Sequence, residues 1–182
     1  MSPLPSSSSA QPLHAATYAT PFGSLAVVVT PEDGVVRGSG FRSVEEVASR
    51  VSPRLRGRGW VVAPINHVAD AVEAWLHGDG TAITDVRAEQ DGGPFFQAVW
   101  EAMRAIPSGQ PESYADLAAA AGRPRAVRAA GTACARNNLA PFVPCHRVVK
   151  SGGALGNYGY GLDVKAAMLT MEASPAASLS SR

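Results

Sequence analysis

The chain has 182 residues, a formal net charge of +1, a hydrophobic content of 46% and a mean hydropathy close to zero. These values are typical of a globular protein with one or two small domains and exclude a highly charged disordered chain. No apolar run reaches membrane-spanning length, so no membrane partner is expected. Residues 1–10 lack the basic start and apolar stretch of a secretion signal.

Three strands are predicted in the first quarter of the chain, because short runs rich in β-branched and small residues are separated by turn-forming Pro, Gly and Asp. The first two form a hairpin across Pro21, Phe22 and Gly23, and the turn at 31–34 leads into the third. The predicted strands span 15–20, 24–30 and 35–41.

Two helices are predicted next. Ser43 is a good N-cap with acidic residues behind it, which indicates a short helix. The basic, glycine-containing segment 54–59 is interpreted as a solvated loop. Residues 65–77 have helical periodicity and end at a Gly-Asp-Gly turn. Residues 81–93 are predicted to be a linker with a strand at its start.

Three helices are predicted in the second half of the chain, at 95–106, 113–121 and 124–137. Ser113 and Asp116 form a capping-box-like pair, and Pro124 suits a first helical turn. The tight turn between the last two helices makes them a candidate helix-turn-helix. The last helix is rich in small residues, which either let it approach DNA closely or pack in the core.

Charge is divided unevenly along the chain. Residues 1–94 hold seven Lys or Arg against ten Asp or Glu, a balance of −3, whereas residues 95–165 hold eight against four, a balance of +4. Basic side chains supply most non-specific DNA affinity, but they also serve simply to solvate a surface. Charge alone does not separate these two interpretations.

The most informative motif is Pro144-Cys145-His146-Arg147. A thiol reacts as thiolate, and a neighbouring imidazole can take its proton. The pair alone favours a structural cysteine, because most cysteines are small buried hydrophobes. The motif Pro144–Arg147 is followed by the β-branched pair 148–149 and a Gly-rich loop carrying Tyr158. We therefore expect a reactive sulfur at a strand edge, beside a mobile loop that holds a flat group.

Several motifs together resemble the O6-alkylguanine-DNA alkyltransferases, also called methylated-DNA–protein-cysteine methyltransferases. They run in register from about Phe95 to Glu172, and the first half of the chain resembles the family only in architecture. The motifs are Phe95–Trp100 with Ile106–Gly109, Ser113–Ala118, Arg125–Ala129, Asn137, and Pro144–Arg147 followed by G-x-L-G-x-Y.

The resemblance implies an α/β fold with two domains. A small N-terminal α+β support domain of the ribonuclease H-like type is expected at 15–93. A mostly helical DNA-binding and alkyl-transfer domain with a helix-turn-helix is expected at 94–173. Residues 1–14 and 174–182 are expected to be disordered tails.

The resemblance also implies catalytic roles for five residues. Cys145 would accept the alkyl group, and His146 would take the thiol proton through a water, because adjacent side chains of an extended segment point to opposite faces. Glu172 would fix and stabilise the imidazole, Tyr114 would donate to the leaving guanine, and Asn137 would brace the Cys145 segment.

DNA contacts and a base pocket follow from the same resemblance. Arg128 would fill the space of an extruded base, and Tyr158 would stack on that base. The carbonyls of Cys145 and Val148 would accept from the exocyclic amine. The expected DNA-binding residues are Tyr114, Ala126, Arg128, Ala129, Gly131 and Ser151. The expected substrate pocket comprises Ala140, Val148, Tyr158, Gly159 and Tyr160.

The implied activity is single-turnover transfer of the alkyl group from O6-alkylguanine, and from O4-alkylthymine, to Cys145. The partner would be double-stranded DNA bound through its minor groove by a monomer. No cofactor and no metal are expected; the remaining histidines, His14, His67 and His77, lack metal-ligand spacing. Because a nucleophile held in a disulfide is inert, Cys134 and Cys145 predict a reducing cytoplasm.

Two other functions stay open. An alkyltransferase-like module would bind lesions without transfer, although the presence of Cys145 argues against it. A Cys-His hydrolase would need an oxyanion hole and turnover. The chain also departs from the family pattern: Tyr160 stands where many members have a small residue, which predicts a narrower pocket, and Phe96 replaces a glutamine.

Overall fold

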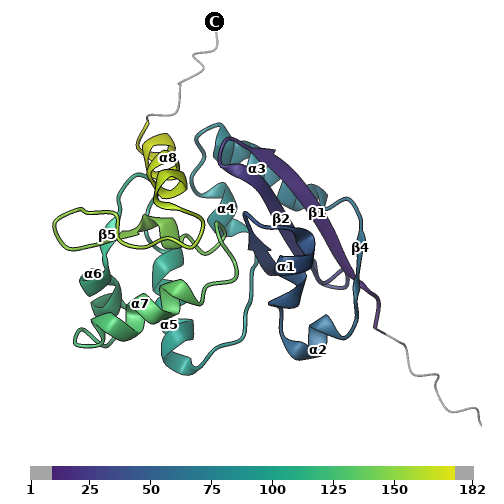
Figure 1. Ribbon diagram of the computed structural model, residues 1–182, viewed down its shortest axis with the longest axis horizontal. Helices are drawn as coiled ribbons and strands as arrows, with labels where there is room; N and C mark the ends of the chain where they lie inside the picture. The colour runs from purple at the N-terminus through teal and green to yellow at the C-terminus, as the bar shows by residue number, and fades with distance from the viewer. Residues whose placement is uncertain (1–9, 175–182) are drawn as a thin grey trace, which may run out of the picture.

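The computed structural model describes residues 10–174. Its first half is a four-stranded sheet in the order β3-β2-β1-β4, which lies beside a helical second half (Figure 1). β1 pairs antiparallel with β2, β2 antiparallel with β3, and β1 parallel with β4. The strands are β1 (Leu13–Thr20), β2 (Gly23–Val29), β3 (Val36–Gly40) and β4 (Trp60–Val62).

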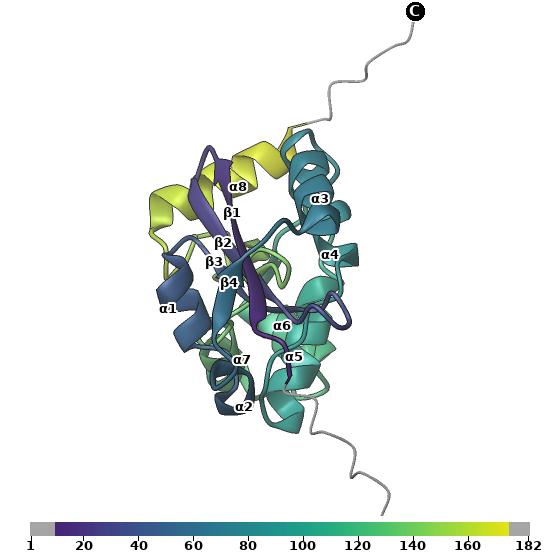
Figure 2. The same cartoon turned by 90° about the vertical axis from the view of Figure 1, so that its right-hand side faces the viewer.

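Both faces of this sheet are buried, which explains the unbroken apolar run of β2. Ala26 and Val28 pack with Val47 of α1 (Val44–Ser49) on one face. Leu25 and Val27 face the larger core that contains α3 (Asn66–Leu76). Figure 2 shows α1 and α3 on opposite sides of the strands. The predicted hairpin, the third strand, the short helix after Ser43 and the longer helix at 65–77 are confirmed.

The predictions for the first half need four corrections. β1 begins at Leu13, so the predicted tail at 1–14 is too long; residues 1–9 lie outside the described part of the chain. The short strand β4 went unpredicted, because its three residues are all apolar and too few to show an alternation. The basic segment at 54–59 begins in a one-turn helix, α2 (Pro53–Arg56). The linker starts with a helix, α4 (Ala82–Asp85), anchored by buried Ile83, and not with a strand.

Within the described residues of the second half, 94–174, the chain forms four helices, a single 3-10 turn and a two-residue parallel strand pair. Ser113 caps α6 through the predicted capping box with Asp116. The strands β5 and β6 pair Glu112 with Val148 and Ser113 with Val149, which fixes the start of α6 beside the Cys145 segment. The elements are α5 (Pro94–Arg104), β5 (Glu112–Ser113), α6 (Tyr114–Ala120), α7 (Val127–Ala135), η1 (Cys145–Arg147), β6 (Val148–Val149) and α8 (Leu162–Ala173).

The last predicted helix is shorter than expected. α7 starts at Val127, because its N-cap Ala126 has a non-helical backbone, so Pro124 precedes the helix instead of opening it. It ends at Ala135, two residues before Asn137, whose side chain is engaged elsewhere. At the other end of the chain, Ser174 caps α8, so the predicted tail at 174–182 overlaps a helix end; residues 175–182 are not described.

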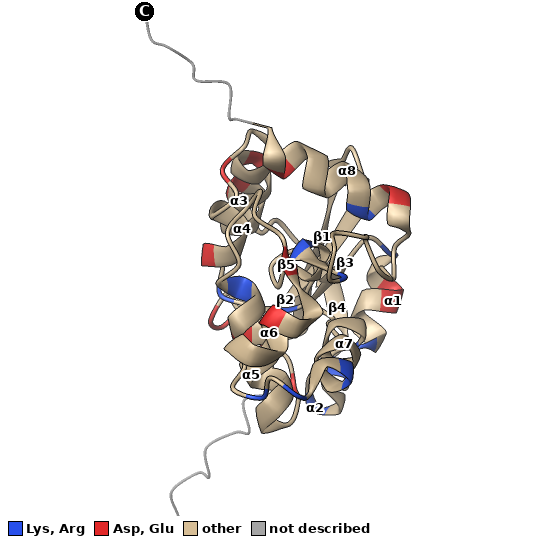
Figure 3. Ribbon diagram, turned by 90° about the vertical axis from the view of Figure 1, so that its left-hand side faces the viewer, with Lys and Arg blue, Asp and Glu red and all other residues tan. Residues whose placement is uncertain are grey.

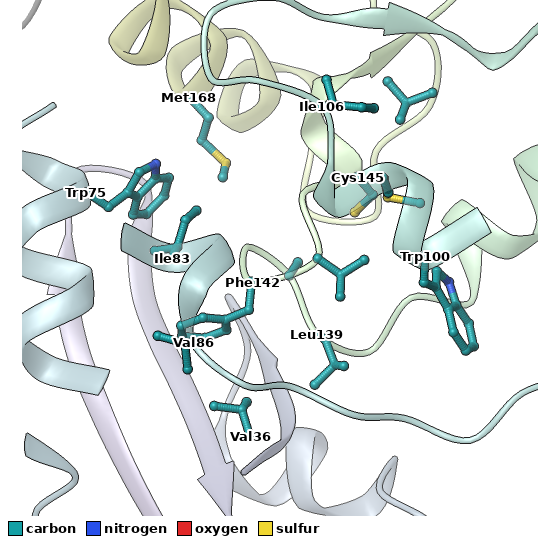
Figure 4. Packing of buried hydrophobic residues seen from close by; sticks show 14 of the residues in the cluster. Val36, Trp75, Ile83, Val86, Trp100, Ile106, Leu139, Phe142, Cys145 and Met168 are labelled. Carbon is teal, nitrogen blue, oxygen red and sulfur yellow. The ribbon is translucent and has the colours of Figure 1, made fainter. Parts of the chain in front are cut away.

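One buried cluster runs across both halves of the chain. It joins Trp75 and Ile83 of the first half to Phe142 and Met168 of the second (Figure 4). Two isolated bridges, Val36 with Ala88 and Ser39 with Leu139, tie β3 to the later segments. The N-terminal sheet therefore packs directly against the segment that carries Cys145. None of the helices in residues 10–174 is long and apolar enough to cross a bilayer.

Candidate active site

Cys145 lies in a cleft of about 660 Å³ between α7, the loop 150–160 and the end of β3. Eight of the residues predicted from the sequence line this cleft together. They are Tyr114, Arg128, Gly131, Asn137, Cys145, Tyr158, Gly159 and Tyr160. Five predicted DNA or pocket residues do not line it: Ala126, Ala129, Ala140, Val148 and Ser151. The sequence reasoning missed Arg42 and Arg50, which come from the first half and line the cleft.

Cys145 occupies a 3-10 turn rather than a strand edge. Its amide donates to Val143 O (2.9 Å), and the Arg147 amide donates to Pro144 O (2.9 Å). The strand begins only at Val148, so the expectation of an extended Cys145-His146 pair is wrong. The two side chains still diverge, since Cys145 lines the cleft whereas His146 is fully buried behind it.

Asn137 and Gln90 form a clamp beneath the nucleophile. Asn137 Nδ2 donates to Val143 O (2.7 Å), and its Oδ1 accepts from the Leu139 amide (3.0 Å) and from Gln90 Nε2 (3.0 Å). Gln90 Oε1 accepts in turn from the Asn138 amide (2.8 Å). A linker side chain thus holds the segment before Cys145. Gln90 carries no sequence signal that would have singled it out.

The thiol of Cys145 is held mainly in its neutral form. Burial raises its pKa, whereas a hydrogen bond from Asn137 and the charge of Lys165 act in the opposite direction. Lys165 is itself fully buried and donates through Nζ to Val148 O (2.6 Å) and to Leu155 O. The Val148 carbonyl, expected to bind the exocyclic amine of a base, thus already accepts one hydrogen bond from Lys165 and keeps a second lone pair.

His146 stands against a buried carboxylate. Its Nε2 lies 3.0 Å from Glu172 Oε1, within ion-pair distance although the N–H is poorly aligned for a hydrogen bond. Burial lowers the pKa of His146, and the Glu172 contact opposes that shift. The neutral imidazole is therefore the resting form. Within the described chain, its Nδ1 has no hydrogen-bond partner.

Glu172 is the centre of a larger buried network. Its side chain is 1% exposed, and it accepts from Arg147 Nε (2.9 Å), from Arg147 Nη2 (2.8 Å) and from Trp75 Nε1 (2.9 Å). Burial alone would raise its pKa, but the close contacts with His146 and Arg147 outweigh burial and hold the pKa at about 2. Glu172 is therefore ionised at neutral pH.

Arg147 connects this network to two further segments by hydrogen bonds. Its Nη1 donates to Ile106 O (2.8 Å) and its Nη2 to Gly80 O (2.9 Å). One guanidinium thus binds α8, the end of α5 and the turn after α3. The motif assigns Arg147 no role of its own, and no sequence signal marks Trp75 as a neighbour of the site.

Tyr114 opens α6 and reaches the cleft. Burial, with a smaller contribution from the two cysteines, raises its pKa to about 12, so its hydroxyl keeps its proton at neutral pH and is available as a donor. Tyr158, on the loop, points its hydroxyl at Met168 Sδ (3.6 Å). The ring of Tyr158 is half-buried and lines the cleft.

Basic side chains surround α7 on the outside of the cleft. Figure 3 shows Lys and Arg gathered along α7 and the turn that leads into it. Arg123, Arg125, Arg128 and Arg136 are exposed. Of these, Arg128 lies on the cleft itself. This face can bind a polyanion without contacting specific bases.

No group of three or more His, Cys, Asp or Glu in residues 10–174 is arranged to hold a metal ion. His67 and His77 are exposed and contact backbone carbonyls, whereas His14 is half-buried on β1. Cys134 is a free thiol whose pKa is raised to about 12 by burial. Cys134 is the more exposed of the two thiols and also lines the cleft, but only Cys145 stands next to His146 and its Glu172 partner, so Cys145 is the candidate nucleophile.

Comparison with known proteins gives a consistent result. A family model described as "6-O-methylguanine DNA methyltransferase, DNA binding domain" matches residues 94–174. The constitutive methylated-DNA–protein-cysteine methyltransferase of Bacillus subtilis is 52% identical over 84 residues, 46% of this chain. The chain spans about half the length of that relative, and less of longer ones. The methylated-DNA–protein-cysteine methyltransferase of Mycolicibacterium paratuberculosis is 40% identical over 63% of this chain and 70% of its own length.

The likeness extends to the first half of the chain in solved structures. The crystal structure of Mycobacterium tuberculosis OGT in complex with DNA superposes with a TM-score of 0.70 at 31% identity. The match covers 87% of this chain and 92% of that one. An α/β fold is therefore shared along most of the described residues.

Removing the Gln90 side chain tests the clamp beneath Cys145. Gln90→Leu deletes two hydrogen bonds and leaves the buried Asn137 amide group with fewer partners. We expect the free energy of unfolding to fall by roughly 1–3 kcal/mol, measured by urea denaturation. Gln110→Leu, at an exposed glutamine, is the matched control and should have little effect. Equal stability of the two variants would contradict the clamp.

The depressed pKa of Glu172 predicts a pH dependence of stability. A carboxyl whose folded-state pKa lies below its unfolded value of about 4.5 stabilises the fold above that value, and this contribution is lost as pH falls toward about 2. The contribution is on the order of 3 kcal/mol. In ¹³C NMR titrations, the Glu172 carboxylate should stay ionised down to about pH 2 or until acid unfolds the chain. A Glu172 carboxyl that titrates near its ordinary value of about 4.5 would show that the network does not stabilise its ionised form.

Proposed function

Because the chain belongs to the methylated-DNA–protein-cysteine methyltransferase family, we propose that it repairs O6-alkylguanine in DNA. The alkyl group passes to Cys145 in a single turnover, and O4-alkylthymine is a second substrate. The observation that carries this proposal is the position of Cys145, which opens into the cleft while His146 and Glu172 lie directly behind it. The basic surface of α7 borders the same cleft.

The transfer step follows from the groups in the cleft. Cys145 Sγ, as thiolate, attacks the alkyl carbon; the carbon–sulfur bond forms while the carbon–O6 bond breaks, and the electron pair leaves with the guanine. His146 takes the thiol proton through a water at Nδ1, and the ionised Glu172 stabilises the imidazolium. Tyr114 donates a hydrogen bond from its hydroxyl to the departing guanine anion, which then takes up a proton from solvent. The product is a thioether that water does not cleave, so the protein is consumed and no cofactor takes part.

Burial of Cys145 makes formation of the thiolate depend on substrate binding. Because burial favours the neutral thiol, the thiolate forms only when the proton can move to His146. A base in the cleft excludes bulk water from the thiol, while His146 and the ionised Glu172 already lie buried side by side to take up and stabilise the proton. Deprotonation is thereby coupled to substrate binding, which protects the sulfur from other electrophiles.

DNA binding is proposed to occur through α6 and α7 as a helix-turn-helix, with α7 in the minor groove. The small residues Ala126, Ala129 and Gly131 allow close approach, and Ser151 contacts the backbone from the loop. A guanine must leave the duplex to reach Cys145; Arg128 fills the space it vacates, and Tyr158 stacks on the flipped base. Asn137 holds the Cys145 segment in place during these steps.

The remaining features of the proposal concern the whole molecule. The sheet of the first half is proposed to be ribonuclease H-like, and the protein to act as a cytoplasmic monomer. The free thiols of Cys134 and Cys145 fit a reducing compartment. A lesion-binding module without transfer is disfavoured by the buried cysteine–histidine–glutamate arrangement, and a hydrolase would release its product and turn over.

Replacing the nucleophile separates transfer from binding. Cys145→Ala should abolish methyl transfer from an O6-methylguanine duplex while retaining affinity for that duplex, because the basic face is untouched. Transfer is followed with a radiolabelled methyl group and binding by fluorescence anisotropy. Cys134→Ala, the control at the second cysteine, should keep transfer. Label on any residue of the Cys145→Ala protein would rule out the assignment.

Arg128 should matter for duplex DNA and not for a free base. Flipping a base costs a few kcal/mol, which Arg128 offsets by replacing the lost stacking. Arg128→Ala should slow repair of an O6-methylguanine duplex by roughly 10- to 100-fold, yet leave the reaction with free O6-benzylguanine nearly unchanged. Arg136→Ala, at an exposed arginine just past α7, is the matched control. Equal losses on both substrates would show that Arg128 supports the pocket instead.

A further inference from the structure

The end of β3 forms a seat for the ring of Tyr160. A methyl group built on Gly40 would overlap the Tyr160 hydroxyl and lie 2.9 Å from its Cζ and 3.3 Å from its Cε1. Real side-chain contacts do not come so close, so the ring rests directly on the glycine backbone. Gly40 has no positive φ; its backbone therefore does not require glycine, and only the contact with Tyr160 does.

The first half of the chain holds this ring from other sides as well. Phe41 meets it edge-on, with centroids 5.4 Å apart. The Arg42 guanidinium lies over it at 5.2 Å from the centroid, and Arg42 Nη2 donates to Gly159 O (3.5 Å). The Tyr158 ring forms a second T-shaped pair with the Tyr160 ring, with centroids 5.4 Å apart. The open space beside the ring is the cleft that it lines.

The β3 backbone at Gly40 cannot easily move away from the Tyr160 ring. Gly40 pairs with Ala26 in the buried part of β2. Ser39, which faces the opposite side of the strand, is also buried, and its amide donates to Asn138 O (2.9 Å), so β3 is held on the side away from the ring. A side chain at position 40 would therefore displace Tyr160 rather than the strand, and the ring would move toward the cleft.

We propose that Gly40 is a positioning residue that sets the width of the alkyl pocket by seating Tyr160 against β3. The inference rests on the proposed function and deepens it, since it concerns the class of O6 substituent admitted. When the Tyr160 ring lies against Gly40, the cleft keeps room for an aryl group despite the bulk of that ring. A methyl substituent needs little of that room, so the seat governs selectivity for large adducts.

The test is Gly40→Ala, alone and combined with Tyr160→Gly. Gly40→Ala should slow single-turnover reaction with free O6-benzylguanine about tenfold, the effect of moderate overpacking, with a much smaller effect on an O6-methylguanine duplex. Adding Tyr160→Gly should restore the benzyl rate, because the displaced ring is gone. Gly57→Ala, at a glycine where a methyl group finds ordinary contacts at 3.7 and 3.9 Å, should change neither rate.

An activity-independent readout separates this inference from the proposed function. In protein labelled with 3-fluorotyrosine, the ¹⁹F resonance that disappears in Tyr160→Gly should shift in Gly40→Ala and not in Gly57→Ala. If the parent protein transfers neither the methyl nor the benzyl group, the proposed function is wrong. The ¹⁹F comparison then still tests whether Gly40 positions the Tyr160 ring. An unshifted resonance, a benzyl rate unaffected by Gly40→Ala, or a loss that Tyr160→Gly does not rescue would overturn the inference.

Discussion

The buried ion pair between Arg147 and Glu172 is the interaction on which the site depends. Two charges removed from water are tolerated only when their hydrogen-bonding groups are paired. Here the carboxylate accepts from Arg147, Trp75 and, at ion-pair distance, His146, and the guanidinium also binds the carbonyls of Ile106 and Gly80. Removing either partner would leave an uncompensated buried charge, at a cost of about 3–5 kcal/mol. The pair therefore fixes α8 against the turn that presents Cys145.

The same interactions make the first half of the chain part of the site. Trp75 touches Glu172, the Gly80 carbonyl receives Arg147, and Gln90 holds Asn137. Arg42 and Arg50 line the cleft. A purely supporting domain would pack against the second half through apolar side chains alone. The polar contacts across the molecule instead reach Cys145, His146 and the neighbouring loop, so the geometry of the candidate site depends on both halves.

The sequence predicted what local chemistry determines and missed what only folding brings together. The capping box at Ser113, the hairpin at Gly23 and the apolar face of α3 follow from nearby residues, and the structure contains all three. The family resemblance carried by several motifs named eight residues that line the cleft and five DNA or pocket residues that do not. Gln90, Trp75 and Gly40 carry no local signal, because their importance comes from partners 47, 97 and 120 positions away. The short elements α2, α4 and β4 were missed because three or four residues are too few to show a period.

The central claim is that Cys145 accepts an alkyl group from DNA and keeps it. Intact-mass spectrometry of the protein after incubation with an O6-methylguanine duplex tests this most directly. The account predicts a gain of one methylene group per molecule, located by peptide mapping on the Cys145 peptide and reached without turnover when DNA is in excess. An unchanged mass, a modification on another residue, or continued release of product beyond one equivalent would contradict it.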